Sequence, residues 1–281
     1  MLIMNIDTHA HLNHPLFDGD REKIIKKCID DNFYIINVGT NLKTSKEIIS
    51  LSQNKNFYAT IGLHPMNLKT GVLSKRKREK NEEKMEDRFD YKKYKDLAKN
   101  DKVVAIGEIG LDYYWKPKTT KRKKIFKKKQ KDLLLQQLRL AKELDLPVVF
   151  HCRMANQDLI KILKENPEVR PEKAVMHCFV GTKKELNSYL KFGFFIGLNG
   201  IIFKTLKNIN FNELIKTVPL NKILIETDCP FLVPPQVDQK RNKPFNIKYV
   251  IKKISKIKNI DFDKLSKIAF ENAKILFSNI T

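Results

Sequence analysis

The stretch Val103-Val104-Ala105-Ile106-Gly107-Glu108 is a short apolar run that ends in a carboxylate. After a polar loop, the segment Lys127 to Leu144 places apolar residues on one face at helical spacing, and a second apolar run, Val148 to His151, follows. A strand, a helix and another strand in this order are typical of a βα repeat. This stretch therefore predicts parallel strands joined by helices.

Similar runs rich in Ile, Val, Phe and Tyr recur along the chain. The eight runs are Leu2 to Asp7, Phe33 to Gly39, Phe57 to Gly62, Val103 to Glu108, Val148 to His151, Ala174 to His177, Phe194 to Gly197 and Ile223 to Glu226. Eight such runs with helices between them favour an α/β fold of the closed (β/α)8 TIM barrel type. The pattern alone leaves an open doubly wound sheet possible. We expect the helical segments Asn246 to Lys258 and Asp261 to Phe277 to complete the outer ring of helices.

The length and composition favour a single domain, residues 1–281. The chain has 281 residues, of which 42% are hydrophobic, and barrels of roughly 250 residues commonly form one domain. Residues 72–95 do not fit the repeat, because Leu73 to Lys95 is mainly charged and contains Lys75-Arg76-Lys77-Arg78-Glu79-Lys80. We expect a solvated insertion after the third strand. A second charged stretch, Lys116 to Lys131, precedes or opens the helix after the fourth strand, and either stretch could contact phosphates or remain a solvated face.

The net charge of +23 favours a polyanionic partner, and nucleic acid is the most abundant candidate. Because most basic residues are Lys, a general compositional bias is an equal explanation. The four cysteines lack C-x-x-C spacing and are expected to be reduced thiols. The first residues show no signal-peptide pattern, and no apolar stretch approaches membrane-spanning length. We therefore expect no membrane partner and a location in the cytoplasm or nucleus, with non-classical export left open. We also expect a monomer.

Five of the six histidines fall at or just beyond the C-terminal end of a predicted strand. They are His9, His11, His64, His151 and His177. In a parallel barrel the C-terminal ends of the strands form the catalytic face. Histidines used as core filler would not concentrate there, so the set as a whole indicates a functional site.

His9 and His11 form an H-x-H pair, whose side chains project to the same side of an extended chain and can reach one cation. Further candidate metal ligands end or follow other strands. They are Glu108, His151, His177 and Asp228. Four imidazoles and two carboxylates exceed the needs of one tetrahedral ion, so we expect two divalent metal ions. Mixed nitrogen and oxygen ligands suit Zn, Mn or Co, while phosphate chemistry often recruits Mg.

A series of motifs in this order resembles the TatD family of metal-dependent DNases. The motifs are Asp7-Thr8-His9-Ala10-His11-Leu12, Gly62-Leu63-His64-Pro65, Gly107-Glu108-Ile109-Gly110-Leu111-Asp112, His151-Cys152-Arg153, His177-Cys178-Phe179-Val180-Gly181, Glu226-Thr227-Asp228-Cys229-Pro230, Arg241-Asn242-Lys243-Pro244 and Glu271-Asn272-Ala273. The resemblance covers nearly the whole chain. It implies a deoxyribonuclease that hydrolyses DNA phosphodiester bonds, with 3′ to 5′ exonuclease action.

The resemblance also implies how the ligands are shared. One ion would be held by His9, His11, Glu108 and Asp228, and the other by Glu108, His151 and His177, with Glu108 as the bridge. Two ions that bind one phosphate can activate the attacking water and neutralise the leaving oxygen. We choose Asp228 as the base that accepts the proton of the water, with a ligand-only role as the alternative.

Other residues near the motifs are expected to bind substrate or support the site. His64 is expected to contact substrate phosphate, although a loop-fixing or capping role is as plausible. Arg153 projects to the same side as His151 and could hold phosphate, or it could pair with Glu226. The aromatic run Tyr113-Tyr114-Trp115 could stack on a base, but packing is the favoured interpretation.

Departures from the family pattern are few: Asn13 stands where an acidic residue is common, and His14 is extra. Two other functions remain open. A deacylase or lactonase of the amidohydrolase type shares the barrel and the H-x-H pair, but many such enzymes use a bridging Lys where this chain has Glu108. A catalytically silent nucleic-acid-binding protein needs surface cations and not imidazoles in a pocket, so the ligand set argues against it.

Overall fold

The computed structural model describes residues 5–70 and 85–280 and contains one sheet of eight parallel strands, hydrogen-bonded in the order in which they occur in the chain. The strands are β1 Ile6–Ala10, β2 Tyr34–Val38, β3 Phe57–Ile61, β4 Val103–Asp112, β5 Val148–Arg153, β6 Ala174–Met176, β7 Phe195–Leu198 and β8 Ile223–Ile225. Beyond β8, the amide of Asp228 donates to the carbonyl of His9 at 2.9 Å, and the amide of His11 donates to the carbonyl of Cys229 at 2.8 Å. These two bonds join the last strand to the first, so the predicted (β/α)8 barrel is confirmed.

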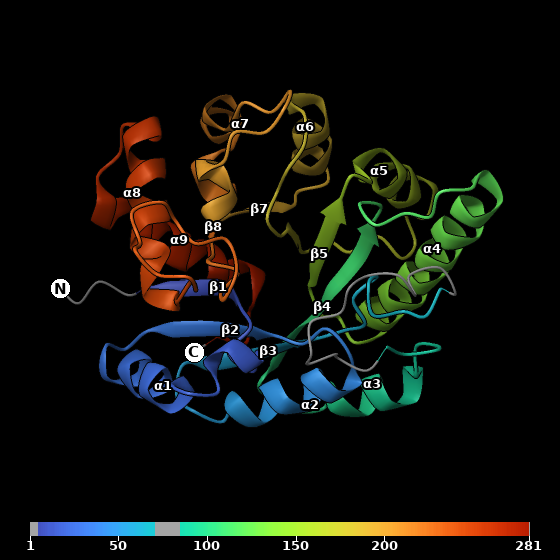
Figure 1. Ribbon diagram of the computed structural model, residues 1–281, viewed down its shortest axis with the longest axis horizontal. Helices are drawn as coiled ribbons and strands as arrows, with labels where there is room; N and C mark the ends of the chain where they lie inside the picture. The colour runs from blue at the N-terminus through green and yellow to red at the C-terminus, as the bar shows by residue number, and fades with distance from the viewer. Residues whose placement is uncertain (1–4, 71–84, 281) are drawn as a thin grey trace.

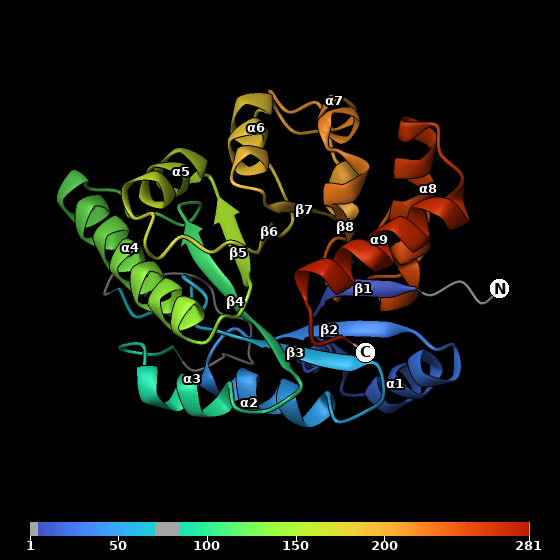
Figure 2. The ribbon, with the colours of Figure 1, turned by 180° about the vertical axis from the view of Figure 1, so that it is seen from behind.

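The α-helices lie around the sheet (Figure 1), and Figure 2 shows the same ring from behind. The helices are α1 Arg21–Asp30, α2 Leu42–Leu51, α3 Tyr91–Leu97, α4 Thr120–Glu143, α5 Asn156–Glu165, α6 Lys183–Lys191, α7 Phe211–Thr217, α8 Ile247–Lys258 and α9 Phe262–Leu276. Short 3-10 turns occur at Pro15–Phe17, Gly200–Phe203, Leu220–Lys222 and Pro244–Asn246. Among the described residues, no helix combines the length and apolar character needed to cross a membrane.

Helix α4 shows how the sequence positions the site. Its N-terminus begins where the side chain of Thr119 accepts a hydrogen bond from the amide of Arg122, which is a standard cap. Its apolar face packs on the barrel, but two buried glutamines interrupt that face. Gln137 bonds the amide and carbonyl of Leu63, and Gln130 bonds the amide and carbonyl of Asp112. Both glutamines therefore fix the backbone where β3 and β4 reach the catalytic face.

The barrel interior forms a hydrophobic cluster of its own at the N-terminal ends of the strands. Side chains from all eight strands take part, and Phe270 of α9 and Phe277 just after it pack against them. The ring of Phe270 lies edge-to-face on Tyr34, with ring centroids 4.9 Å apart. Helix α9 thus packs in the ring of helices through Leu265 and Ala269, as expected, and its second half also closes this end of the barrel. The opposite end stays available for polar side chains.

The boundary of the predicted insertion also needs correction. Residues 71–84, including the basic cluster Lys75 to Lys80, lie outside the described residues. Tyr91–Leu97, however, forms helix α3, and Tyr94 is fully buried against the barrel, where its hydroxyl donates to the carbonyl of Gly62. The last part of the predicted segment 72–95 therefore belongs to the ring of helices.

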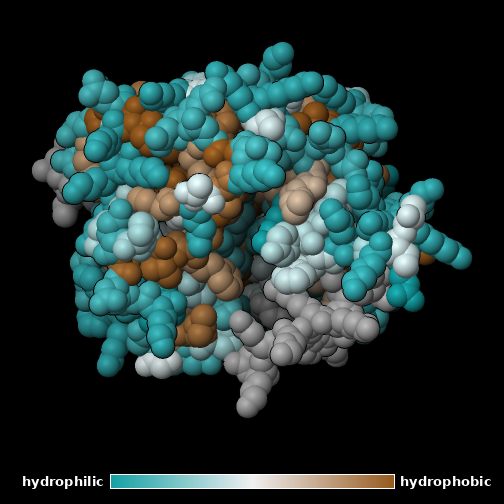
Figure 3. Space-filling view, turned by 45° about the horizontal axis from the view of Figure 1, so that its top comes forward, coloured by the Kyte–Doolittle hydropathy of each residue, from teal (hydrophilic) through white to brown (hydrophobic). Residues whose placement is uncertain are grey.

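Hydrophilic side chains cover most of the face drawn in Figure 3, with smaller apolar groups between them and a hollow near the centre. This surface agrees with the high content of charged residues, 31% of the chain.

Candidate metal centre

The structure brings the six residues expected to bind metal together at the C-terminal ends of five strands. His9 lies in β1 and His11 directly after it, Glu108 lies in β4, and His151 lies in β5. His177 follows β6 at once, and Asp228 follows β8 in a left-handed backbone conformation with φ of 56°. Such a conformation is costly for a residue other than Gly and is common at functional sites.

Glu108 stands at the centre of the cluster, and its two oxygens face different histidines. Oε2 lies 3.6 Å from Nε2 of His9 and 4.0 Å from Nε2 of His11. Oε1 lies 2.6 Å from Nδ1 of His151 and 3.8 Å from Nε2 of His177. One buried carboxylate therefore connects the two halves of the barrel mouth.

Asp228 closes the cluster on the side of β1. Its Oδ1 lies 3.5 Å from Nε2 of His11, 3.9 Å from Nε2 of His9 and 4.0 Å from Nε2 of His177. His9, His11 and Asp228 place one ligand atom each within 4.8 Å of one another, a separation suited to a shared cation.

Hydrogen-bond partners behind the rings decide which nitrogen points inward. Nδ1 of His11 donates to the carbonyl of Val38 at 3.0 Å, which leaves Nε2 without a proton in the neutral ring. Nδ1 of His177 lies 2.8 Å from Oε1 of Glu226, and its Nε2 again faces the cluster. Carboxylates and carbonyls behind metal-binding histidines commonly fix the ring in this way.

His151 has a carboxylate at each ring nitrogen. Nδ1 faces Glu108, and Nε2 lies 3.1 Å from Oδ2 of Asp112 at the end of β4. Oδ1 of Asp112 accepts a hydrogen bond from the amide of Tyr114, so the same carboxylate also fixes the loop after β4. Sequence reasoning gave Asp112 no role, although the residue lies in one of the quoted motifs.

The carboxylates and imidazoles of the cluster shift one another's pKa values. Burial favours the neutral form of Glu108, but electrostatic interactions and hydrogen bonds with His64 and His151 outweigh burial and hold the pKa of Glu108 well below its usual range. Burial also opposes charge on two histidines, yet Asp112 and Glu108 raise the pKa of His151 to about 9, and Glu226 raises the pKa of His177 to about 10. Cations that bind here would replace these imidazole protons.

The residues present fit a metal ion. Both ring nitrogens of His9 are buried without a hydrogen-bond partner, and burial together with the neighbouring His177 lowers the pKa of His9. A buried polar atom without a partner is rare, and a neutral imidazole is the form that binds metal. Glu108 and Asp228 supply the carboxylate oxygens that a divalent ion also requires.

The two residues expected to bind substrate lie in different surroundings. Nε2 of His64 lies 3.5 Å from Oε1 of Glu108, while its Nδ1 accepts a hydrogen bond from the amide of Met66. His64 therefore joins the cluster and also fixes its own loop. The guanidinium of Arg153 is exposed and lies over the ring of Tyr114, with Cζ 3.8 Å from the ring centroid. Its expected alternative partner, Glu226, instead contacts His177 and Asn199.

The comparison with known proteins agrees with the motifs. The model of the family described as TatD related DNase matches residues 6–278. The chain belongs to this family. Members are metal-dependent hydrolases, and this TatD-family chain is one of them.

Similar proteins match over almost their full length. YabD of Bacillus subtilis, an uncharacterized metal-dependent hydrolase, is 36% identical over 277 residues, which cover 98% of this chain and 99% of YabD. The 3′-5′ ssDNA/RNA exonuclease TatD of Shigella flexneri is 30% identical over 277 residues, covering 96% and 98% of the two chains. The crystal structure of YjjV, a TatD homolog from Escherichia coli, matches with a TM-score of 0.81 at 28% identity, covering 99% of each chain.

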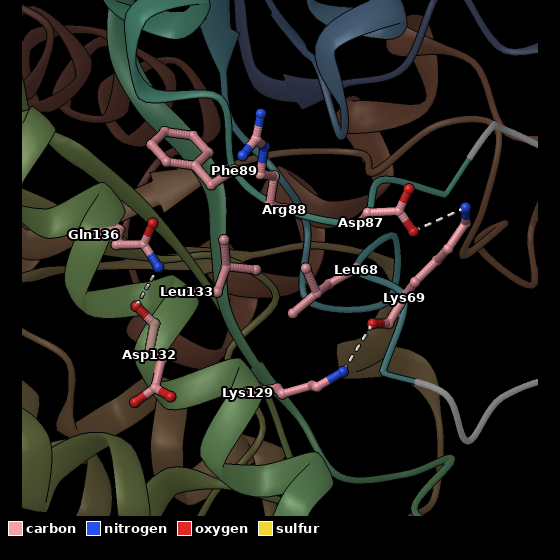
Figure 4. A pocket seen from close by; sticks show the side chains of 9 residues that line it. All are labelled: Leu68, Lys69, Asp87, Arg88, Phe89, Lys129, Asp132, Leu133 and Gln136. Carbon is pink, nitrogen blue, oxygen red and sulfur yellow. Dashed lines mark hydrogen bonds and ion pairs between the residues drawn. The ribbon is translucent and has the colours of Figure 1, made fainter.

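A cavity on the outer surface lies apart from the TatD-family motifs. It is bordered by α4 and by the segments around Leu68 and Phe89 (Figure 4). Lys69 pairs with Asp87 at 2.9 Å on one side of it. None of the six residues expected to bind metal lines this cavity.

Proposed function

We propose that this TatD-family hydrolase is a nuclease that cleaves phosphodiester bonds of DNA with two divalent ions, Mg, Mn or Zn, and removes nucleotides from the 3′ end of single strands. The family description names a DNase, and the relative from Shigella flexneri is named as a 3′-5′ ssDNA/RNA exonuclease. The net charge of +23 supports a polyanionic substrate, because it raises the local concentration of nucleic acid.

The observation that carries this proposal is the placement of Glu108. One of its oxygens faces His9 and His11, and the other faces His151 and His177. In our proposal Glu108 bridges two ions, the first held also by His9, His11 and Asp228 and the second also by His151 and His177. This division of its two oxygens suits a carboxylate that bridges two ions.

The ions, when bound, supply Lewis acidity that polarises the phosphate and lowers the pKa of the attacking water. Side chains of the protein accept the proton and orient the imidazole rings. Oδ1 of Asp228 faces the imidazoles, so its second oxygen, Oδ2, is our candidate to accept the proton of the water. Glu226 and Asp112 hold the rings of His177 and His151 in place.

His64 and Arg153 are our candidates for binding the substrate phosphate. Because Nδ1 of His64 accepts a backbone hydrogen bond, the neutral ring carries its proton on Nε2, which points toward the cluster. His64 is therefore oriented as a hydrogen-bond donor and not as a metal ligand. Arg153 stands at the end of β5, two residues after His151, and brings a permanent positive charge to the rim.

The strand that carries Glu108 argues against the rival hydrolases. A bridging carboxylated Lys would have to come from β4, and Val103–Asp112 contains no Lys. We further propose that the chain is one domain, since all the described strands belong to one sheet around one barrel interior.

A degradation assay tests the proposed function. Purified protein is incubated with linear and circular single-stranded DNA, with linear strands blocked at either end, and with or without chelator. We expect metal-dependent loss of linear strands, and protection by a 3′ block and not by a 5′ block. Intact DNA in every lane would reject the nuclease, bound but intact DNA would indicate a binding protein, and cleavage of circles would replace exonuclease by endonuclease action.

A further inference from the structure

Two aromatic side chains on the loop after β4 are exposed beside the metal centre. Tyr114 and Trp115 are 46% and 43% exposed, whereas the preceding Tyr113 is buried and bonds Asp158 through its hydroxyl. The expected packing therefore holds for Tyr113 alone. Tyr113 thus anchors the start of the loop, and the next two rings lie at the surface.

The loop that presents these rings is tied to the cluster. Asp112 accepts the amide proton of Tyr114 at 2.8 Å and contacts His151 at 3.1 Å, so one carboxylate joins the ring-bearing loop to the centre. The guanidinium of Arg153 lies over Tyr114, and the rings of Tyr114 and Trp115 meet edge-to-face with centroids 4.8 Å apart. We call Tyr114, Trp115 and Arg153 the β4–β5 platform.

A third exposed ring borders the centre from the loop after β8. Phe231 is 45% exposed, and its amide donates to the backbone carbonyl of Asp228 at 2.9 Å. This bond fixes Phe231 next to Asp228, whose carboxylate belongs to the cluster. Its ring meets His11 edge-to-face at a centroid distance of 6.1 Å, and it meets His14 at 5.3 Å.

The topology places Phe231 and the β4–β5 platform on opposite sides of the barrel mouth. In a closed sheet with the order β1 to β8, the junction of β8 and β1 faces the junction of β4 and β5 across the barrel. Phe231 therefore stands on one side of the cluster and the β4–β5 platform on the other. Glu108 and the ligand histidines lie between them.

We propose that Phe231 and the β4–β5 platform stack on the two nucleobases that flank the phosphate at the metal centre. This inference rests on the proposed nuclease function and adds the residues that recognise the bases. Aromatic rings and guanidinium planes bind unpaired bases by stacking, and every base offers a π-face, so the recognition tolerates any sequence. Paired bases inside a duplex cannot reach either ring, so the two stacking positions select unpaired ends.

The fluorescence of Trp115 tests this inference, because Trp115 is the only tryptophan of the chain. The metal-loaded protein is titrated with a short oligothymidine that carries hydrolysis-resistant phosphorothioate linkages. A matched strand lacks the bases of its two 3′-terminal nucleotides. We expect saturable quenching by the complete strand and about 5- to 100-fold weaker binding of the abasic strand, as alanine substitution of stacking rings suggests.

The variants Tyr114→Ala and Phe231→Ala should each weaken binding of the complete strand by about 5- to 100-fold. In both variants the ratio between the dissociation constants of abasic and complete strands should fall toward one. The matched control is Ile275→Ala, since Ile275 is 60% exposed on α9, the helix that closes the other end of the barrel. This control should bind both strands as the wild type does.

Equal binding of complete and abasic strands by the wild type would overturn the inference, and so would wild-type affinity in both ring variants. Hydrolysis of ordinary strands is measured in parallel. If hydrolysis is normal and complete and abasic strands bind equally, the stacking inference is wrong and the nuclease proposal is retained. If nothing is hydrolysed, the nuclease proposal fails, and the quenching still shows whether bases stack.

Discussion

A Cβ atom on residue 197 would lie 2.5 Å from Oε2 of Glu226, so Gly197 leaves the space in which this carboxylate stands. Glu226 uses that space to contact Nδ1 of His177 at 2.8 Å and to accept a hydrogen bond from the amide of Cys178 at 2.8 Å. Gly197 in β7 thus leaves room for the carboxylate of Glu226, which follows β8, to lie behind His177, which follows β6.

Replacing Gly197 by Ala should therefore weaken metal binding without touching a ligand. The added methyl group displaces Glu226, and His177 loses the partner that orients its ring. We expect metal affinity to fall about 10- to 100-fold, the usual cost of losing such a partner. Titration with Mn²⁺ or Zn²⁺ against an indicator measures it. Gly19→Ala is the control, because a Cβ there meets nothing within 4 Å. Unchanged affinity in the Gly197 variant would show that Glu226 does not support the site.

Glu108→Gln tests the bridge itself. The amide keeps the size of the side chain but removes the charge and one acceptor oxygen, so it cannot serve two cations. We expect turnover to fall by more than the roughly 100-fold that a lost supporting partner costs, and the number of bound ions per chain to drop. Elemental analysis after dialysis counts the ions. A variant that retains near-normal turnover would refute the two-ion assignment.

His64→Ala separates substrate binding from metal binding. Because Nε2 of His64 is oriented as a donor, we expect a KM about 10- to 100-fold higher, typical of removing a hydrogen bond to a charged group, with both ions retained. Steady-state kinetics together with ion counting distinguish the two roles. Loss of an ion would instead make His64 a ligand, as its place beside Glu108 and His151 would allow.

The fold and the convergence of the site followed from local patterns. Apolar runs at regular intervals with helical segments between them indicate a barrel, and residues that end parallel strands must meet on one face. This is why Glu108 and His151, 43 positions apart in the chain, could be expected at one rim.

The contacts that the sequence did not reveal depend on register and on tertiary packing. Asp112 reaches His151 because β4 continues past Glu108 and pairs Asp112 with Arg153 of β5. Helix α3 has few apolar residues to show periodicity, and it packs on the barrel mainly through the buried Tyr94, with the partly buried Tyr91 and Leu97 beside it. Likewise, nothing in a run of three aromatic residues tells which ring is buried.

The ion pair between Asp20 and Arg241 should make stability depend on pH. Arg241 donates to Asp20 at 2.6 Å, and this hydrogen bond keeps the pKa of Asp20 below its usual value. A carboxyl whose pKa is lower in the folded state stabilises the protein above the unfolded pKa, and this contribution disappears as the pH falls through the folded pKa.

Asp20→Asn should therefore lower the free energy of unfolding at pH 7 by about 1 kcal/mol, since the pair is partly exposed. The difference between wild type and variant should shrink below the ordinary carboxyl pKa, near 3.8. Urea unfolding of both proteins at several pH values measures it. A difference that stays constant down to the lowest pH would assign the effect to packing.

Basic residues around the start of α4 should determine much of the salt dependence of DNA binding. Lys116, Lys118, Lys121 and Lys124 are exposed on and just after the loop that carries Tyr114 and Trp115, at the catalytic end of the barrel. For every phosphate that these lysines neutralise, their replacement by Gln should reduce the slope of log affinity against log salt by about 0.7 for single strands. Affinities measured at several salt concentrations give this slope.

The matched control replaces Lys252 and Lys256 by Gln. Both are exposed toward the C-terminal end of α8, which faces the opposite end of the barrel. An equal change of slope in both variants would mean that the lysines act through net charge alone, whereas an unchanged slope in the α4 variant would make that stretch a solvated face.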